Sequence, residues 1–123
     1  MPYALNEHDG VIRVTLQGTV SGAELHELIT EMEQLVEGRS AWPDSLFDLR
    51  GVELTLGITD MMGLARRREA TKPPHAVRTA FVADSALLTG FARMFQSTNH
   101  DPNVTIEVFS DLEAAQAWLQ APR

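Results

Sequence analysis

The chain contains no cysteine in its 123 residues. This absence excludes disulfides, thiolate metal sites and cysteine nucleophiles, and it agrees with a reducing compartment. No apolar run approaches the roughly 20 residues that a membrane-spanning helix needs. The opening residues, MPYALNEHDG, have neither a basic start nor an apolar core. We therefore expect no signal peptide and a cytoplasmic protein.

Positive charge is also scarce. The sequence has 10 Lys and Arg residues against 17 Asp and Glu, a formal net charge of −7, and Lys72 is its sole lysine. A protein of this charge repels a phosphate backbone, so we expect no binding to nucleic acid. The one basic cluster is Arg66-Arg67-Arg68, and Glu69 follows it directly.

Length and composition fit one globular domain spanning residues 1–123. The hydrophobic content of 44% is typical of globular chains. A domain of this size buries about two-thirds of its unfolded surface, which is enough for a core without disulfides or metals.

Five segments have the patterns of β-strands. Residues 11–17 alternate apolar and polar side chains, and His8-Asp9-Gly10 predicts a hairpin turn that joins them to a short strand at 3–7. Residues 46–49 and 80–83 place apolar side chains on both faces, which is typical of central strands covered on both sides, and we expect these strands at about 46–49 and 78–83. Residues 104–109 alternate again and indicate a strand nearer an edge.

Four segments have the patterns of helices. Ser21 and Glu24 match a capping box that opens a helix ending near Gly38. A second helix is expected over residues 60–70, because two prolines follow it. A third begins after Asp84-Ser85, and a second capping box at residues 110–113 opens the last.

Alternating strands and helices predict an α/β fold. We expect a five-stranded, mostly parallel sheet with an N-terminal β-hairpin and four helices. Polar cap residues follow each parallel strand, at the sheet edge where open α/β folds place ligands. These residues are Ser21, Thr59 with Asp60, Asp84 with Ser85, and Ser110 with Asp111.

Several segments carry a family resemblance over nearly the whole chain. They are Gly18 to Ser21, Leu46 to Arg50, Asp60 to Leu64, and Val108 to Asp111 with Trp118-Leu119. In these segments and in its order of elements the chain resembles the SpoIIAA-like family, relatives of bacterial anti-sigma-factor antagonists and STAS domains. The resemblance is to the uncharacterised branch of the family. It implies a STAS-like fold and a non-catalytic regulatory module.

The start of the second helix departs from the antagonist pattern. In those proteins this helix begins Asp-Ser-Ser-Gly, and phosphorylation of one serine blocks partner binding. Asp60 and Gly63 match the pattern, but Met61 and Met62 stand in place of both serines. The resemblance therefore implies a module without the phosphorylatable serine. The nearest hydroxyl, Thr59, is interpreted as a helix cap.

The first functional interpretation is a protein-binding surface at this helix start. Its candidate residues are Thr59, Asp60, Met61, Met62, Arg66 and Arg67, together with Ser21, Asp84 and Ser85 on the same sheet edge. The partner would be another protein or a second copy of the chain, and the helix N-terminus would favour an anion.

Plainer interpretations of the same residues stay open. One methionine would enter the core while the other covers a gap, and the arginines would pair with acids on the first helix. Consecutive helical residues point in different directions, so the three arginines cannot all hold one ligand.

A second functional interpretation is a carrier or sensor of a small apolar or anionic, lipid-like ligand. If the helix at 60–70 stands off the sheet, large side chains would line a cavity; otherwise they fill a close-packed core. These side chains are Trp42, Phe47, Met61, Met62, Phe91, Met94 and Phe95.

No motif indicates an enzyme, a metal site or a cofactor. The helix containing His26 begins like a zinc-protease motif but has Thr30 where the second histidine ligand would be. The sequence has no Gly-x-Ser-x-Gly, Walker or Gly-x-Gly-x-x-Gly motif. Asp48, in an apolar strand, is either a perturbed carboxylate or a hydrogen-bonded residue near a strand end.

Overall fold

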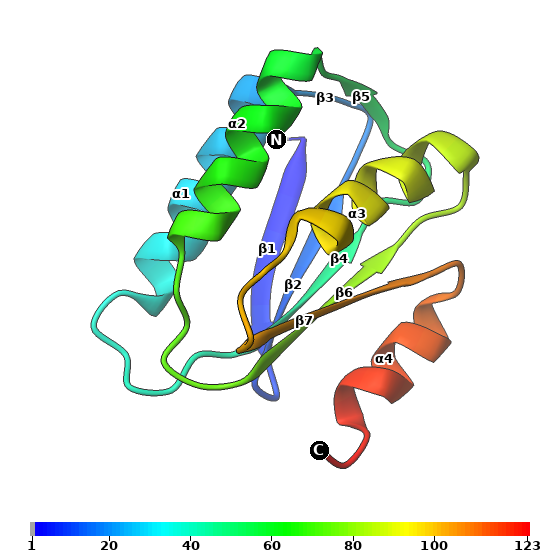
Figure 1. Cartoon of the computed structure of the whole chain (residues 1–123). Coiled ribbons are helices and arrows are strands. Elements are labelled where there is room, and N and C mark those ends of the chain that lie inside the picture. The colour runs from blue at the N-terminus through cyan, green and yellow to red at the C-terminus, as the bar shows by residue number, and fades with distance from the viewer. Residues whose placement is uncertain (1) are drawn as a thin grey trace.

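The structure is a computed structural model and describes residues 2–123. Strands and helices alternate along the chain, as the sequence predicts (Figure 1). In chain order the elements are β1 (Tyr3–His8), β2 (Val11–Leu16), β3 (Thr19–Ser21), α1 (Gly22–Val36), β4 (Asp44–Asp48), β5 (Glu53–Thr55), α2 (Ile58–Ala70), β6 (Val77–Val82), α3 (Ala86–Thr98), β7 (Val104–Phe109) and α4 (Leu112–Gln120).

The main sheet has five strands in the order β1-β2-β4-β6-β7. β1 and β2 are antiparallel, and every other neighbouring pair is parallel. Asp9 and Gly10 form the two-residue turn between β1 and β2, and both have positive φ angles, of 51° and 75°. This conformation suits Asp-Gly in a tight hairpin. The predicted hairpin and mostly parallel sheet are confirmed.

The two faces of the sheet are covered differently. α1, α2 and α3 lie over one face, and α4 covers the other alone, against Leu46, Ala80 and Val82 (Figure 1). Successive side chains of a strand point to opposite faces, so β4 and β6 need apolar residues at both. This explains the continuous apolar runs of the two central strands.

A second, two-stranded sheet was not predicted. β3 and β5 pair in parallel, with Ser21 opposite Thr55. Strands of three residues are too short to show a period of two, so the sequence gives no signal for them. β3 leads into α1 and β5 precedes α2, so this pairing brings the N-termini of the two helices together.

The helix starts confirm some capping predictions and correct others. Ser21 and Glu24 form the predicted capping box of α1, and Ser85 caps α3. The prediction of Thr59 as a cap is wrong, because α2 begins at Ile58 with Gly57 as its N-cap. The last helix is capped by Asp111 instead of Ser110, since its carboxylate accepts a hydrogen bond from the Glu113 N–H at 2.9 Å.

Candidate functional site

Three side chains in the middle of the main sheet are only half-buried. Ser45 and Phe47 of β4 and Thr79 of β6 face the layer of α1, α2 and α3. Their neighbours Leu46 and Ala80, which face α4, are 2% and 0% exposed. Protein interiors are normally close-packed, so exposure at central strands marks open space above them.

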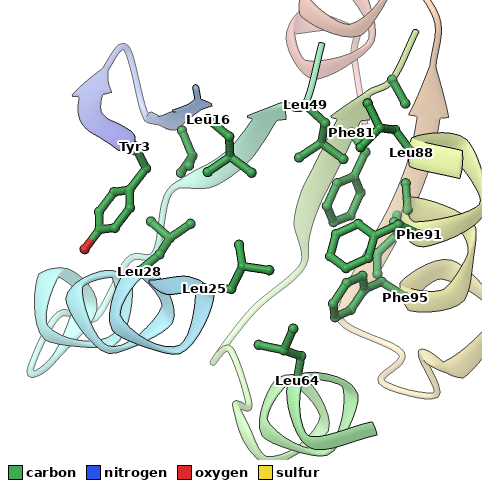
Figure 2. Close-up of a cluster of buried hydrophobic side chains, with 14 of the residues drawn as sticks. Tyr3, Leu16, Leu25, Leu28, Leu49, Leu64, Phe81, Leu88, Phe91 and Phe95 are labelled. Atoms are coloured by element: carbon green, nitrogen blue, oxygen red, sulfur yellow. The ribbon is translucent and has the colours of Figure 1, made fainter. Parts of the chain in front are cut away.

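That space is a cavity of about 160 Å³ between the sheet and the three helices. Figure 2 shows Leu25 and Leu28 of α1, Leu64 of α2, and Phe91 and Phe95 of α3 gathered around a common interior. Its volume is close to that of an engineered apolar cavity of about 150 Å³ that stays dry and binds benzene. The cavity is therefore large enough for a small apolar molecule.

A continuous aromatic stack forms one wall. Phe47 and Phe81 stack across β4 and β6 with ring centroids 5.0 Å apart, and Phe81 stacks on Phe95 at 5.8 Å. Phe91 meets Phe95 edge to face at 5.2 Å. The stack links the sheet to α3 and gives this side of the cavity a defined shape.

Few polar groups reach the cavity. Ser45 and Thr79 are register partners on β4 and β6 and place two hydroxyls on its floor. Glu33, Arg68 and Thr71 line it from the ends of α1 and α2. A mostly apolar wall with a few polar groups is the usual composition of a small-molecule site.

A surface groove adjoins the cavity. It runs between the C-terminal parts of α1 and α2, where its walls include Gln34 and Ala70. Cavity and groove share four lining residues: Glu33, Val36, Trp42 and Thr71. The groove and the cavity therefore meet at these four residues.

The arginine cluster diverges, as consecutive helical positions require. Arg66 is exposed. Arg67 turns to α1, where its guanidinium donates to the His26 carbonyl at 3.0 Å and to the Glu33 carboxylate at 2.9 Å. The interpretation that an arginine pairs with an acid on the first helix is confirmed for Arg67.

Arg68 lies differently from both neighbours, in the cavity wall. Its Nη1 donates to the Thr71 carbonyl at 3.1 Å. Burial lowers the pKa of Arg68, and the negative charge of Asp101 acts in the opposite direction. Arginine nevertheless stays protonated in proteins, so a positive charge borders the apolar interior.

The predicted surface at the start of α2 is divided between structural and exposed residues. Asp60 accepts a hydrogen bond from the Gly57 N–H at 3.1 Å and packs against Gly22 at the start of α1. Met61 is half-buried and packs against the core, whereas Met62 is 51% exposed. Thr59 is exposed. Met61 therefore matches the plainer interpretation of a core methionine, whereas Met62 stays at the surface.

The other predicted edge residues have separate local roles. Ser21 accepts a hydrogen bond from the Glu24 N–H at 3.2 Å, as part of the capping box of α1. The Asp84 carboxylate accepts one from the Gly51 N–H at 3.4 Å, in the turn after β4. Ser85 accepts one from the Leu88 N–H at 3.2 Å.

The expected cavity wall was partly right. Trp42, Phe47, Phe91 and Phe95 line the cavity, but including Met61, Met62 and Met94 was wrong. The face of α2 that reaches the cavity carries Leu64 and Arg68, which are four residues apart. That spacing on one helical face was the available signal for Arg68, which the predicted cavity wall did not include.

Of the two interpretations of Asp48, the structure shows the second, a hydrogen-bonded residue near a strand end. Both of its carboxylate oxygens accept from the Arg50 guanidinium, at 2.9 Å and 2.8 Å. These bonds hold the pKa of Asp48 below its usual value. Within residues 2–123, no three His, Cys, Asp or Glu side chains come together as a metal site would require.

A family model described as SpoIIAA-like matches residues 11–120. The chain belongs to the SpoIIAA-like family. The fold of this SpoIIAA-like chain is also that of a solved structure, an uncharacterized protein of the DUF3478 family with a SpoIIAA-like fold from Shewanella loihica PV-4. The two are 14% identical with a TM-score of 0.64, over 95% of this chain and 91% of the other. A comparison with curated proteins finds no match.

Proposed function

We propose that this SpoIIAA-like protein is a non-catalytic binding module that holds a small apolar ligand between its sheet and its helices, as a carrier or sensor. The observation that carries the proposal is the cavity of about 160 Å³ above Ser45, Phe47 and Thr79. Membership of the SpoIIAA-like family supports a module of the regulatory type.

The free-energy cost of an empty cavity supports a functional role for it. At about 24 cal/mol per Å³, an empty cavity of this size costs roughly 4 kcal/mol of stability. Folded domains are stable by only about 5–15 kcal/mol in total. A ligand that fills the space restores the missing contacts and stabilises the folded state.

The charged groups of the cavity wall favour binding over chemistry. The Glu33 carboxylate is paired with Arg67, and Arg68, as an arginine, stays protonated and does not act as a base. We therefore propose no catalytic residue.

No helix within residues 2–123 is long and apolar enough to cross a bilayer. The compartment that we propose is the cytoplasm.

The two tryptophans offer a direct test. Trp42 lines the cavity, and Trp118 of α4 packs on the opposite face of the sheet against Phe109. In a Trp118→Phe variant, titration with octan-1-ol should change the emission of Trp42 saturably and raise the melting temperature. In the matched Trp42→Phe variant, the emission of Trp118 should stay constant. An unsaturable response, or an equal response of both variants, would contradict binding in the cavity.

A second candidate function rests on the exposed start of α2. Ile58 and Met62 are 79% and 51% exposed, and they lie four residues apart on one helical face. Apolar side chains on one exposed helical face suit a protein partner or a second copy of the chain. In this second candidate function, the predicted surface of Thr59, Met62 and Arg66 is the docking site.

A further inference from the structure

We propose that Arg68 selects the head group of the ligand, so that the occupant is a carboxylic acid with a short apolar tail. This inference rests on the proposed function, because it assigns a ligand class to the same cavity.

The hydrogen bonding of Arg68 is incomplete. An arginine side chain has five N–H donors. Within residues 2–123, the Arg68 side chain makes one hydrogen bond, to the Thr71 carbonyl, and no ion pair. Arg67, one position earlier, has the Glu33 carboxylate as its partner at 2.9 Å. Arg68 therefore has donors available for a ligand.

The position of these donors indicates the ligand chemistry. Arg68 is half-buried, and only one of its five N–H donors has a protein partner among residues 2–123, so the other donors are open to water or to a ligand. A carboxylate bound by the planar guanidinium fork would supply charge and acceptors together. An alcohol or hydrocarbon would bring no negative charge to the guanidinium.

Nearby acids favour a head group with a single negative charge. Glu33 also lines the cavity, but Arg67 neutralises it. Asp101 acts on the charge of Arg68 from the loop after α3, and its Oδ2 is buried without a hydrogen-bond partner. Because Asp101 already offsets part of the positive charge, a carboxylate fits better than a doubly charged phosphate.

The cavity volume limits the length of the tail. An engineered cavity of about 150 Å³ holds one benzene molecule, which has six carbons, so a space of about 160 Å³ suits an apolar group of about that size. The adjoining groove, which shares Trp42 and Thr71 with the cavity, accommodates the rest of a slightly longer chain. Octanoate is therefore a suitable probe, and octan-1-ol is its uncharged match.

The test compares both probes on three proteins that share the Trp118→Phe background, with Trp42 as reporter. Without a further change, we expect octanoate to bind on the order of tenfold more tightly than octan-1-ol. Arg68→Met should abolish that preference, by weakening octanoate on the order of tenfold relative to octan-1-ol. Asp101→Asn should strengthen the preference, because it removes a competing negative charge but keeps the acceptor that binds the Asn103 N–H.

Melting temperatures measured without ligand test whether each variant is folded. Arg68→Met removes the hydrogen bond to the Thr71 carbonyl and the positive charge that acts on Asp101, so it should lower the melting temperature while leaving a single cooperative transition. Equal affinity for the two probes, or a preference that survives Arg68→Met, would overturn the head-group inference and leave the cavity function standing. Failure of both probes to bind any of the three proteins would overturn the proposed function and this inference with it.

Discussion

Thr79 and Ala80 are consecutive residues of β6 that face two differently packed layers. Thr79 is half-buried and borders the cavity, whereas Ala80 is wholly buried beneath α4. At this position of the sheet the side under α4 is close-packed, and the opposite side has space that a ligand can fill.

Enlarging these two residues should have opposite effects on stability. Thr79→Leu adds apolar volume to the cavity and should keep or raise the free energy of unfolding, by up to about 1 kcal/mol. Ala80→Leu overpacks the interface with α4 and should lower it by about 1–3 kcal/mol. Urea denaturation of both variants measures the contrast. Equal destabilisation would show that the cavity side is as tightly packed as the α4 side.

The fold was predictable because local signals agreed with it. Asp9-Gly10 predicted the hairpin. The apolar residues on both faces of β4 and β6 predicted a parallel sheet with helices over each face. The pairing of β3 with β5 was not predictable, because three residues carry no period.

The cavity could not be predicted from side-chain type alone. Leu25, Leu28 and Leu64 would suit a filled core equally well, and their distance from the sheet depends on how α1 and α2 pack together. Arg67 contributes to that packing, and its inward-facing neighbour Arg68 looked identical in the sequence.

Arg67 should hold α2 against α1. Arg67→Ala removes an ion pair with Glu33 and hydrogen bonds to the His26 carbonyl and the Thr30 hydroxyl. Because the Arg67 side chain is 27% exposed, we expect a loss of about 1–2 kcal/mol in the free energy of unfolding. The exposed neighbour is the control: Arg66→Ala should stay within about 0.5 kcal/mol of the parent. Matching losses in the two variants would contradict the assigned role.

Gly22 should be required where α1 meets α2. A Cβ at residue 22 would lie 2.7 Å from Cγ of Asp60, so Gly22→Ala must displace the carboxylate that binds the Gly57 N–H. We expect a destabilisation of about 1–2 kcal/mol, through the contact and the lost cap. A Cβ at Gly90, in α3, would meet nothing within 4 Å. Gly90→Ala should therefore stabilise the protein by about 0.5–1 kcal/mol. Thermal denaturation of both variants gives the comparison.

Asp48 should make the stability of the folded protein depend on pH. The Arg50 guanidinium lowers the pKa of Asp48 in the folded protein, below the value of about 3.9 in an unfolded chain. The stabilisation is therefore present above the unfolded pKa and is lost as the pH falls through the folded pKa. The stability advantage of the parent over Asp48→Asn should shrink as the pH is lowered below about 5. Urea denaturation across pH 7 to pH 3 measures it, and a constant difference would contradict the ion pair.

Met62 tests the second candidate function. Its side chain is 51% exposed, so Met62→Asp should change the free energy of unfolding by no more than about 0.5 kcal/mol. If the start of α2 docks a partner or a second copy, this change should abolish the complex seen by size-exclusion chromatography. The control, Leu35→Asp, alters an apolar residue that is 39% exposed near the end of α1, and it should leave the complex intact. A complex that survives Met62→Asp would place the docking surface elsewhere.

Native mass spectrometry of the protein purified from its own cells, without detergent, tests the central claim most directly. The account predicts a bound species whose mass, after organic extraction, is that of a carboxylic acid with a short apolar tail. Loss of that species in Arg68→Met would identify the head-group contact. Repeated spectra of the empty chain alone, together with no stabilisation by octanoate or octan-1-ol, would contradict a ligand-binding cavity.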